Sequence, residues 1–191
     1  MLYLVHGGGE DETAWMNQGR DNFIMDYLIA ESKCDPFIIV CTYGMTNECK
    51  WGHMHEFDWT EFQRVLIEDL IPYIDSNFKT KAERRYRAMA GLSMGGMETR
   101  MLTLKYPEVF GYWGLLSGGT YAPEDIASLK VSPSYIFISC GSKEYPESVT
   151  KAVEALKAAG YNAHGYVSEG TAHEFLSWRR SLREMAPMLF K

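Results

Sequence analysis

One serine of the chain stands in a frame that favours nucleophilic chemistry. Residues 91–96 read GLSMGG, so Ser93 has a glycine two positions before it and another two positions after it. This frame allows a sharp turn from a strand into a helix, which exposes the hydroxyl and places backbone N–H groups of the helix beside it. We expect Ser93 to attack a carbonyl carbon. Ser117 also precedes glycines but lacks the frame, and we interpret it as part of a turn.

A serine hydroxyl is a weak nucleophile, so a base and an acid are expected further along the chain. His173 follows the last predicted strand, and Glu144 follows the strand before it. Nucleophile, acid and histidine follow one another in this order in hydrolases that carry the same serine frame. We predict that His173 is the general base and that Glu144 holds its imidazole, with Glu147 as the alternative acid.

A run of glycines follows the first predicted strand. His6 precedes Gly7, Gly8 and Gly9, and glycines let the backbone approach a bound ester closely. We expect the N–H groups of Gly8 and of Met94, the residue after the nucleophile, to form an oxyanion hole. A plain glycine turn is the alternative for the loop.

Three side chains are candidates for substrate contact. Trp51 and His53 belong to the loop 43–59, which follows the second predicted strand and is rich in aromatic residues. Trp15 follows the glycine run. Aromatic rings near the nucleophile could hold a planar phenolic acyl group. Packing of the loop on its own cluster, and of Trp15 in the core, are equally compatible with the sequence. The chemistry requires no metal and no cofactor.

Short apolar segments alternate with longer amphipathic ones along the chain. The apolar segments are nearly continuous, which is typical of strands covered on both faces. Strands are predicted at Leu2–Val5, Phe37–Thr42, Tyr86–Ala90, Tyr112–Leu116, Tyr135–Cys140 and Ala163–Val167. Helices are predicted at Asp21–Glu31, Trp59–Phe78 with a kink or break at Pro72, Met94–Tyr106, Glu147–Ala159 and Glu174–Leu189. This alternation predicts the α/β class, with one mostly parallel sheet of about six strands and helices on both faces.

Length and charge narrow the class of protein. The 191 residues suit one domain spanning 1–191. The net charge of -6 argues against binding to nucleic acid. No apolar run approaches the roughly 18–20 residues of a membrane span. No signal peptide opens the chain, so the sequence leaves the compartment open: cytoplasmic as written, or secreted or periplasmic if N-terminal residues are missing.

Five motifs in this order resemble carbohydrate esterase family one, which includes feruloyl esterases and acetyl xylan esterases, with esterase D more distant. They are LYLVHGGGEDETAW, LIPYIDSNF, RAMAGLSMGG, FISCGSKE and EGTAHEFLSWRRSL, and they cover nearly the whole chain. The resemblance implies an α/β-hydrolase fold and hydrolysis of hydroxycinnamoyl or acetyl esters on arabinoxylan-like polysaccharide. The family usually carries aspartate where Glu144 stands. Two other hypotheses remain: a siderophore-ester or small acyl-thioester hydrolase, and a hydrolase-fold binding module without turnover.

The resemblance also carries an expectation about assembly. The family begins with antiparallel strands upstream of the segment that matches Leu2–Val5, and this chain lacks them. Phe37–Thr42 would then form an apolar sheet edge with unpaired backbone groups. We expect a second copy of the chain to cover that edge in a two-fold homodimer, or else the loop 43–59 to fold back over it.

Overall fold

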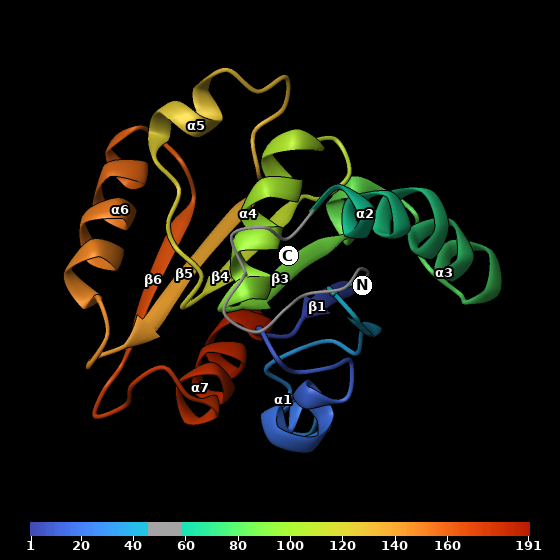
Figure 1. The fold of residues 1–191 in the computed structure, drawn as a ribbon, viewed down its shortest axis with the longest axis horizontal. Helices are drawn as coiled ribbons and strands as arrows, with labels where there is room; N and C mark the ends of the chain where they lie inside the picture. The colour runs from blue at the N-terminus through green and yellow to red at the C-terminus, as the bar shows by residue number, and fades with distance from the viewer. Residues whose placement is uncertain (46–58) are drawn as a thin grey trace.

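The computed structural model describes residues 1–45 and 59–191, in which helices cover both faces of a parallel sheet (Figure 1). The strands are β1 (Leu2–Val5), β2 (Ile39–Thr42), β3 (Ala88–Leu92), β4 (Tyr112–Leu116), β5 (Tyr135–Gly141) and β6 (Ala163–Ser168). They lie in the order β2-β1-β3-β4-β5-β6, and every neighbouring pair runs parallel. The predicted α/β class and the sheet of six strands are confirmed.

Strand β1 illustrates why the strand sequences read as continuous apolar runs. Successive side chains of a strand point to opposite faces of the sheet. Tyr3 and Val5 belong to the core on one face, and Leu2 and Leu4 belong to the core on the other. All four side chains are fully buried. Helices on both faces therefore demand apolar residues at every position of the strand.

The helices divide between the two faces of the sheet. They are α1 (Asp21–Ala30), α2 (Trp59–Arg64), α3 (Ile71–Asn77), α4 (Met94–Lys105), α5 (Pro123–Ala127), α6 (Pro146–Ala158) and α7 (Phe175–Met185). Helices α1 and α7 lie together on one face, and α2, α3, α4 and α6 cover the other (Figure 1). In the described part of the chain, no helix combines the length and apolar character that crossing a bilayer requires.

The structure refines the predicted boundaries at several points. The helix predicted at 59–78 consists of α2, a π-helical stretch at Val65–Leu70, and α3. Pro72 lies at the start of α3, directly after the π-helical stretch, and the backbone before it stays helical, so no break occurs there. The start predicted for β3 at Tyr86 was wrong, because Arg84–Tyr86 form a 3-10 turn. Helix α5 was not predicted, since its five residues are too few to show a period.

Glu98 is a buried carboxylic acid on α4. Its side chain is 1% exposed, and neither carboxyl oxygen has a hydrogen-bond partner among the described residues. The backbone at Gly44 packs so closely that a Cβ there would lie 2.6 Å from Glu98 Oε2. Burial raises the pKa of Glu98 from 4.5 to about 9, because an unpaired carboxylate is costly away from water. Glu98 is therefore protonated in the folded protein at neutral pH.

The buried acid makes stability depend on pH in a specific direction. Because the pKa of Glu98 is higher in the folded state than in the unfolded state, the folded protein binds the proton more tightly. The contribution of this group to stability is fully present below pH 4.5, the unfolded pKa, and is lost as the pH rises through about 9. Glu98→Gln removes the ionisable group, while the constant effect of burying an amide cancels when pH values are compared. Between pH 5 and pH 8 the Tm of the variant, relative to the wild type, should rise by roughly 5 °C or more.

Thermal unfolding followed by circular dichroism at several pH values measures this difference. Glu154→Gln, at an exposed position of α6, is the control and should follow the wild-type pH dependence. Parallel Tm profiles for Glu98→Gln and the wild type would mean that Glu98 ionises in the folded protein.

Candidate active site

A strained turn presents Ser93 at the carboxyl edge of the sheet. Strand β3 ends at Leu92 and helix α4 begins at Met94, so Ser93 alone joins strand to helix. Its backbone has φ 51° and ψ -115°. A residue with a side chain adopts such a positive φ only where the surrounding structure enforces it, and this strain is concentrated at functional sites. The predicted strand–turn–helix is thus present around Ser93.

Two glycines of the serine frame are required by close backbone contacts. A Cβ at Gly91 would lie 2.2 Å from the carbonyl oxygen of Gly95. A Cβ at Gly95 would lie 2.5 Å from the carbonyl oxygen of His6 and 2.7 Å from that of Val5. Backbone atoms cannot move away as a flexible side chain can. The glycines therefore bring the serine turn against the end of β1 and the loop that follows it.

The structure brings the predicted nucleophile, base and acid into one chain of hydrogen bonds. His173 Nε2 lies 2.8 Å from Ser93 Oγ, and His173 Nδ1 lies 2.6 Å from Glu144 Oε1. Glu144 follows β5 and His173 follows β6. With the proton on Nδ1, the ring donates to the carboxylate and leaves Nε2 free to accept the serine proton. Glu147, the alternative acid, is exposed in the first turn of α6.

Burial differs sharply between the base and the acid. The side chain of His173 is 49% exposed, whereas that of Glu144 is 7% exposed. Glu144 Oε2 accepts hydrogen bonds from Ser117 Oγ at 2.8 Å and from the Gly141 N–H at 2.6 Å. Both oxygens of the carboxylate thus have partners. The base is open to an incoming substrate, and the acid behind it is fixed.

His6 holds the glycine loop in one orientation. The Gly44 N–H donates to His6 Nε2 at 3.2 Å, so the ring proton is on Nδ1, which donates to the Gly7 carbonyl oxygen at 2.7 Å. That oxygen and the Gly8 N–H belong to the same trans peptide and point in opposite directions. The Gly7 N–H is already bound to Glu10 Oε2 at 2.8 Å. His6 thereby directs the Gly8 N–H away from its own ring.

The two predicted oxyanion donors are unoccupied in the part of the chain that is described. Neither the Gly8 N–H nor the Met94 N–H donates to any acceptor within residues 1–45 and 59–191. Met94 is the first residue of α4, so its N–H has no acceptor in the helix. The glycine loop lies beside the nucleophile, because a Cβ at Gly7 would be 3.5 Å from Ser93 Cβ. Both N–H groups therefore lack an acceptor within these ranges, as an oxyanion hole would require.

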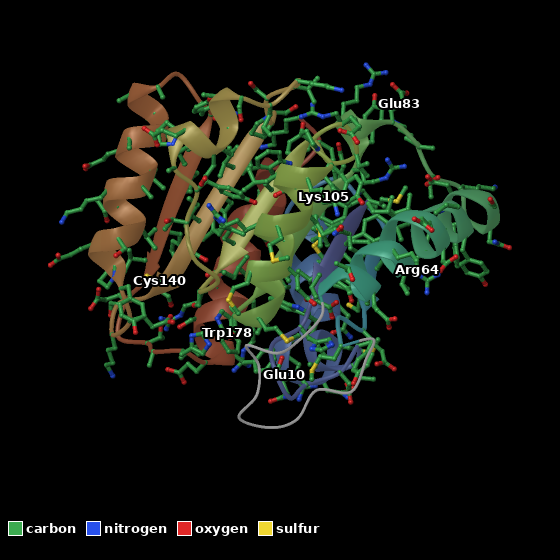
Figure 2. All side chains as sticks on the ribbon, turned by 45° about the horizontal axis from the view of Figure 1, so that its top comes forward. Glu10, Arg64, Glu83, Lys105, Cys140 and Trp178 are labelled. Atoms are coloured by element: carbon green, nitrogen blue, oxygen red, sulfur yellow. The ribbon has the colours of Figure 1, made fainter. Side chains whose placement is uncertain are left out.

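The site occupies the end of the sheet toward which the strands run. Figure 2 places Glu10, Cys140 and Trp178 in the lower half of the molecule, whereas Glu83, which precedes β3, lies at the top. Cys140 is the penultimate residue of β5, and Glu10 belongs to the glycine loop after β1. Parallel sheets gather their functional loops at this edge.

The prediction that Trp15 contacts substrate is corrected by the structure. Trp15 begins a π-helical turn that directs its ring inward, where it is fully buried and donates from Nε1 to the Val5 carbonyl oxygen at 3.0 Å. It supports the strand beneath the glycine loop. Trp51 and His53 lie outside the described residues. Within the described residues, no three metal-binding side chains cluster.

Ser117 and Trp178 are functional neighbours that the sequence analysis missed. Ser117 directly follows β4, the strand between those that lead to Ser93 and Glu144, and its hydroxyl binds Glu144. Trp178 on α7 contacts the ring of His173 edge-on, with centroids 5.1 Å apart. The strand order was the available signal, since a polar residue at the end of β4 must lie between the two loops.

Comparisons with known proteins agree with this geometry. The chain matches the Esterase family, described as "Putative esterase", over residues 1–189. It is 61% identical over 191 residues to the endo-1,4-beta-xylanase/feruloyl esterase of Xylanibacter ruminicola. The aligned region covers all of this chain and 26% of that protein. The chain therefore spans about a quarter of the length of this curated relative. The resemblance to esterases predicted from the motifs is confirmed.

Solved structures share the fold at low sequence identity. A ferulic acid esterase from Anaeromyces mucronatus, in complex with ferulic acid, superposes with a TM-score of 0.82 at 17% identity, covering 99% of this chain and 78% of that chain. The feruloyl esterase module from Clostridium thermocellum, complexed with sinapinate, gives a TM-score of 0.80 at 24% identity, covering 99% of this chain and 76% of that chain. These likenesses establish the α/β-hydrolase fold.

Proposed function

The chain belongs to the esterase family, and from this membership we propose that it hydrolyses feruloyl or acetyl esters of plant cell-wall polysaccharide through an acyl-enzyme on Ser93. The observation that carries the proposal is the continuous hydrogen bonding from Ser93 to His173 to Glu144, at 2.8 and 2.6 Å. The substrate class is supported by the relative from Xylanibacter ruminicola, which is named a feruloyl esterase and is 61% identical to the chain.

In the first half of the reaction, Ser93 Oγ attacks the ester carbonyl carbon as its proton passes to His173 Nε2. The carbonyl oxygen becomes an oxyanion and accepts hydrogen bonds from the N–H groups of Gly8 and Met94. The intermediate collapses, the bond to the sugar oxygen breaks, and that oxygen takes the proton from Nε2. The acyl group remains on Ser93.

In the second half, water replaces the sugar. His173 Nε2 accepts a proton from the water as its oxygen attacks the acyl carbon, and the same two N–H groups bind the second oxyanion. Collapse releases the carboxylic acid, and Ser93 recovers its proton from Nε2. Glu144 keeps the imidazole in the required tautomer and stabilises its charged form in both halves.

A substrate panel tests the proposed function. The purified chain is assayed on methyl ferulate, p-nitrophenyl acetate and a triscatecholate ester, with Ser93→Ala as the control. Hydrolysis of methyl ferulate or the acetate that disappears in the variant is the expected result. Preferential cleavage of the triscatecholate would assign the site to siderophore esters. A folded protein that hydrolyses none of the three would be a binding module.

We also propose that a second copy of the chain covers the outer edge of β2. This strand lies at the end of the sheet and pairs only with β1 among the described residues. Ile39, Val40 and Cys41 are half-buried, and no charge or proline interrupts residues 37–42. Apolar edges of this kind are rarely left open to solvent. Pairing of two such edges around a two-fold axis would make one continuous sheet.

The mass in solution tests this pairing. Light scattering should give twice the mass of the chain. The amides of Ile39 and Cys41, which point away from β1, should exchange slowly with deuterium, because only a strand on the outer edge would protect them. Amide exchange on β6, the opposite edge, is the internal comparison. A monomer whose Ile39 and Cys41 amides exchange rapidly would rule the pairing out.

A further inference from the structure

The hydroxyl of Ser117 stands between an indole and the acid of the candidate site. Trp178 Nε1 lies 3.0 Å from Ser117 Oγ, and Ser117 Oγ lies 2.8 Å from Glu144 Oε2. An indole N–H can only donate, and an ionised carboxylate can only accept. The direction is therefore fixed: Trp178 donates to the Ser117 oxygen, and the single Ser117 proton is donated to Glu144.

The backbone of Ser117 is held in a strained conformation. Its φ is 52°, which favours glycine, yet a serine occupies the position immediately before Gly118. The Ser117 N–H donates to the Ser139 carbonyl oxygen at 2.8 Å. Gly118 packs on the first turn of α4, where a Cβ would lie 2.4 Å from the Gly96 Cα. The turn is thus fixed between the nucleophile helix and β5, and strain retained at such a place points to a role for the side chain.

Trp178 contacts the base as well as the serine. Its side chain is 5% exposed, and its ring meets those of His173 and Phe175 edge-on, with centroids 5.1 and 4.9 Å apart. One indole therefore packs against the imidazole and orients the hydroxyl that binds the carboxylate. The base and the acid are restrained through a common neighbour.

A glutamate at this position needs such a restraint more than an aspartate would. Its side chain has one more rotatable bond than aspartate, so its carboxylate is more costly to hold in one place. The Gly141 N–H and the Ser117 hydroxyl both bind Oε2, at 2.6 and 2.8 Å, which leaves Oε1 facing His173. Without the hydroxyl, a single backbone donor would hold that oxygen.

We propose that Ser117, oriented by the indole N–H of Trp178, is a positioning residue that holds Glu144 against His173. This inference rests on the proposed function of the same site. Ser117 touches no reacting atom, so its removal should lower kcat and leave KM nearly unchanged.

The kinetic test uses Ser117→Ala and Ser117→Gly. Loss of one hydrogen bond to a charged group should lower kcat on methyl ferulate about 10- to 100-fold. The glycine variant relieves the positive φ, which offsets part of the stability lost with the two hydrogen bonds of the hydroxyl. Ser181→Ala is the matched control, because this serine of α7 is also buried and, among the described residues, its hydroxyl binds only the Ser177 carbonyl oxygen. The control should change kcat by less than about twofold.

A double-mutant cycle separates positioning from a general structural effect. If Ser117 acts through the Glu144 carboxylate, Ser117→Ala should cost little further activity in a Glu144→Gln background. Trp178→Phe retains an aromatic ring but removes the N–H, and it should show a smaller loss of kcat than Ser117→Ala. An equal loss in both backgrounds, or an unchanged kcat in both Ser117 variants, would overturn the inference.

Proton NMR reads the same contact without turnover. The proton between His173 Nδ1 and Glu144 Oε1 should give a far-downfield resonance in the wild type and in Ser181→Ala, and it should weaken or move upfield in both Ser117 variants. An unchanged resonance would refute the positioning role. The proposed function fails on a different result, namely a wild type without esterase activity or an active Ser93→Ala variant.

Discussion

Ser93→Ala is expected to lower kcat on methyl ferulate by roughly 10⁴-fold or more while the protein remains folded. The variant removes the hydroxyl that we propose forms the acyl-enzyme, and no other serine hydroxyl lies within hydrogen-bond distance of His173 Nε2 among the described residues. The residual rate would come from the oxyanion donors and substrate binding. Thermal unfolding should be nearly unchanged, because alanine retains the Cβ that the turn already accommodates.

Steady-state kinetics on the purified variant measure the loss. Ser76→Ala is a suitable control, since Ser76 is an exposed residue of α3 whose hydroxyl binds the Pro72 carbonyl oxygen. A Ser93→Ala variant that keeps more than about a tenth of the wild-type rate would assign the nucleophile elsewhere, because losses at a nucleophile are far larger.

Glu144→Gln is expected to lower kcat by roughly 10³- to 10⁴-fold, because it reverses the tautomer of the base. Gly141 N–H and Ser117 O–H both donate to Oε2, so the amide oxygen of glutamine must take that place. The amide nitrogen then faces His173 Nδ1 and donates to it. The ring proton moves to Nε2, which can no longer accept the proton of Ser93.

Glu147→Gln is the matched comparison for this prediction. Glu147 lies three residues further along the chain, exposed in the first turn of α6, and its substitution should leave kcat within about twofold of the wild type. The kcat values of both variants on methyl ferulate show which of the two carboxylates orients the imidazole of His173. Equal, mild losses would mean that another group orients the imidazole.

The parts of the site that could be predicted depend on local pattern or on chain order. The frame around Ser93 spans five residues and is visible in the sequence. Glu144 and His173 follow from counting strands, since each follows a strand beyond the serine turn. The contact between Ser117 and Trp178 joins residues 61 positions apart and has no local pattern. Only the packing of α7 against the sheet brings them together.

Trp15 shows the opposite failure, in which a local pattern was misleading. Its place after the glycine run was equally compatible with a position in the cleft and with one in the core, and the cleft was chosen as the candidate. The π-helical turn that begins at Trp15 rotates the ring inward over Gly19, where a Cβ would lie 2.6 Å from Trp15 Cε3. The direction of a side chain in a short irregular turn depends on such packing. The spacing of residues in the sequence therefore does not predict the direction of the Trp15 ring.

The separation of the site residues along the chain has a consequence for folding kinetics. Ser93 and His173 are 80 residues apart, and Glu144 and His173 are 29 apart. Their meeting requires β3, β4, β5 and β6 to be paired in register, and parallel pairing between distant segments forms slowly. Helices need no such long-range contacts and form much earlier. During refolding from denaturant, the far-UV signal should therefore recover before enzymatic rate, and the appearance of activity would time the closure of the last strand.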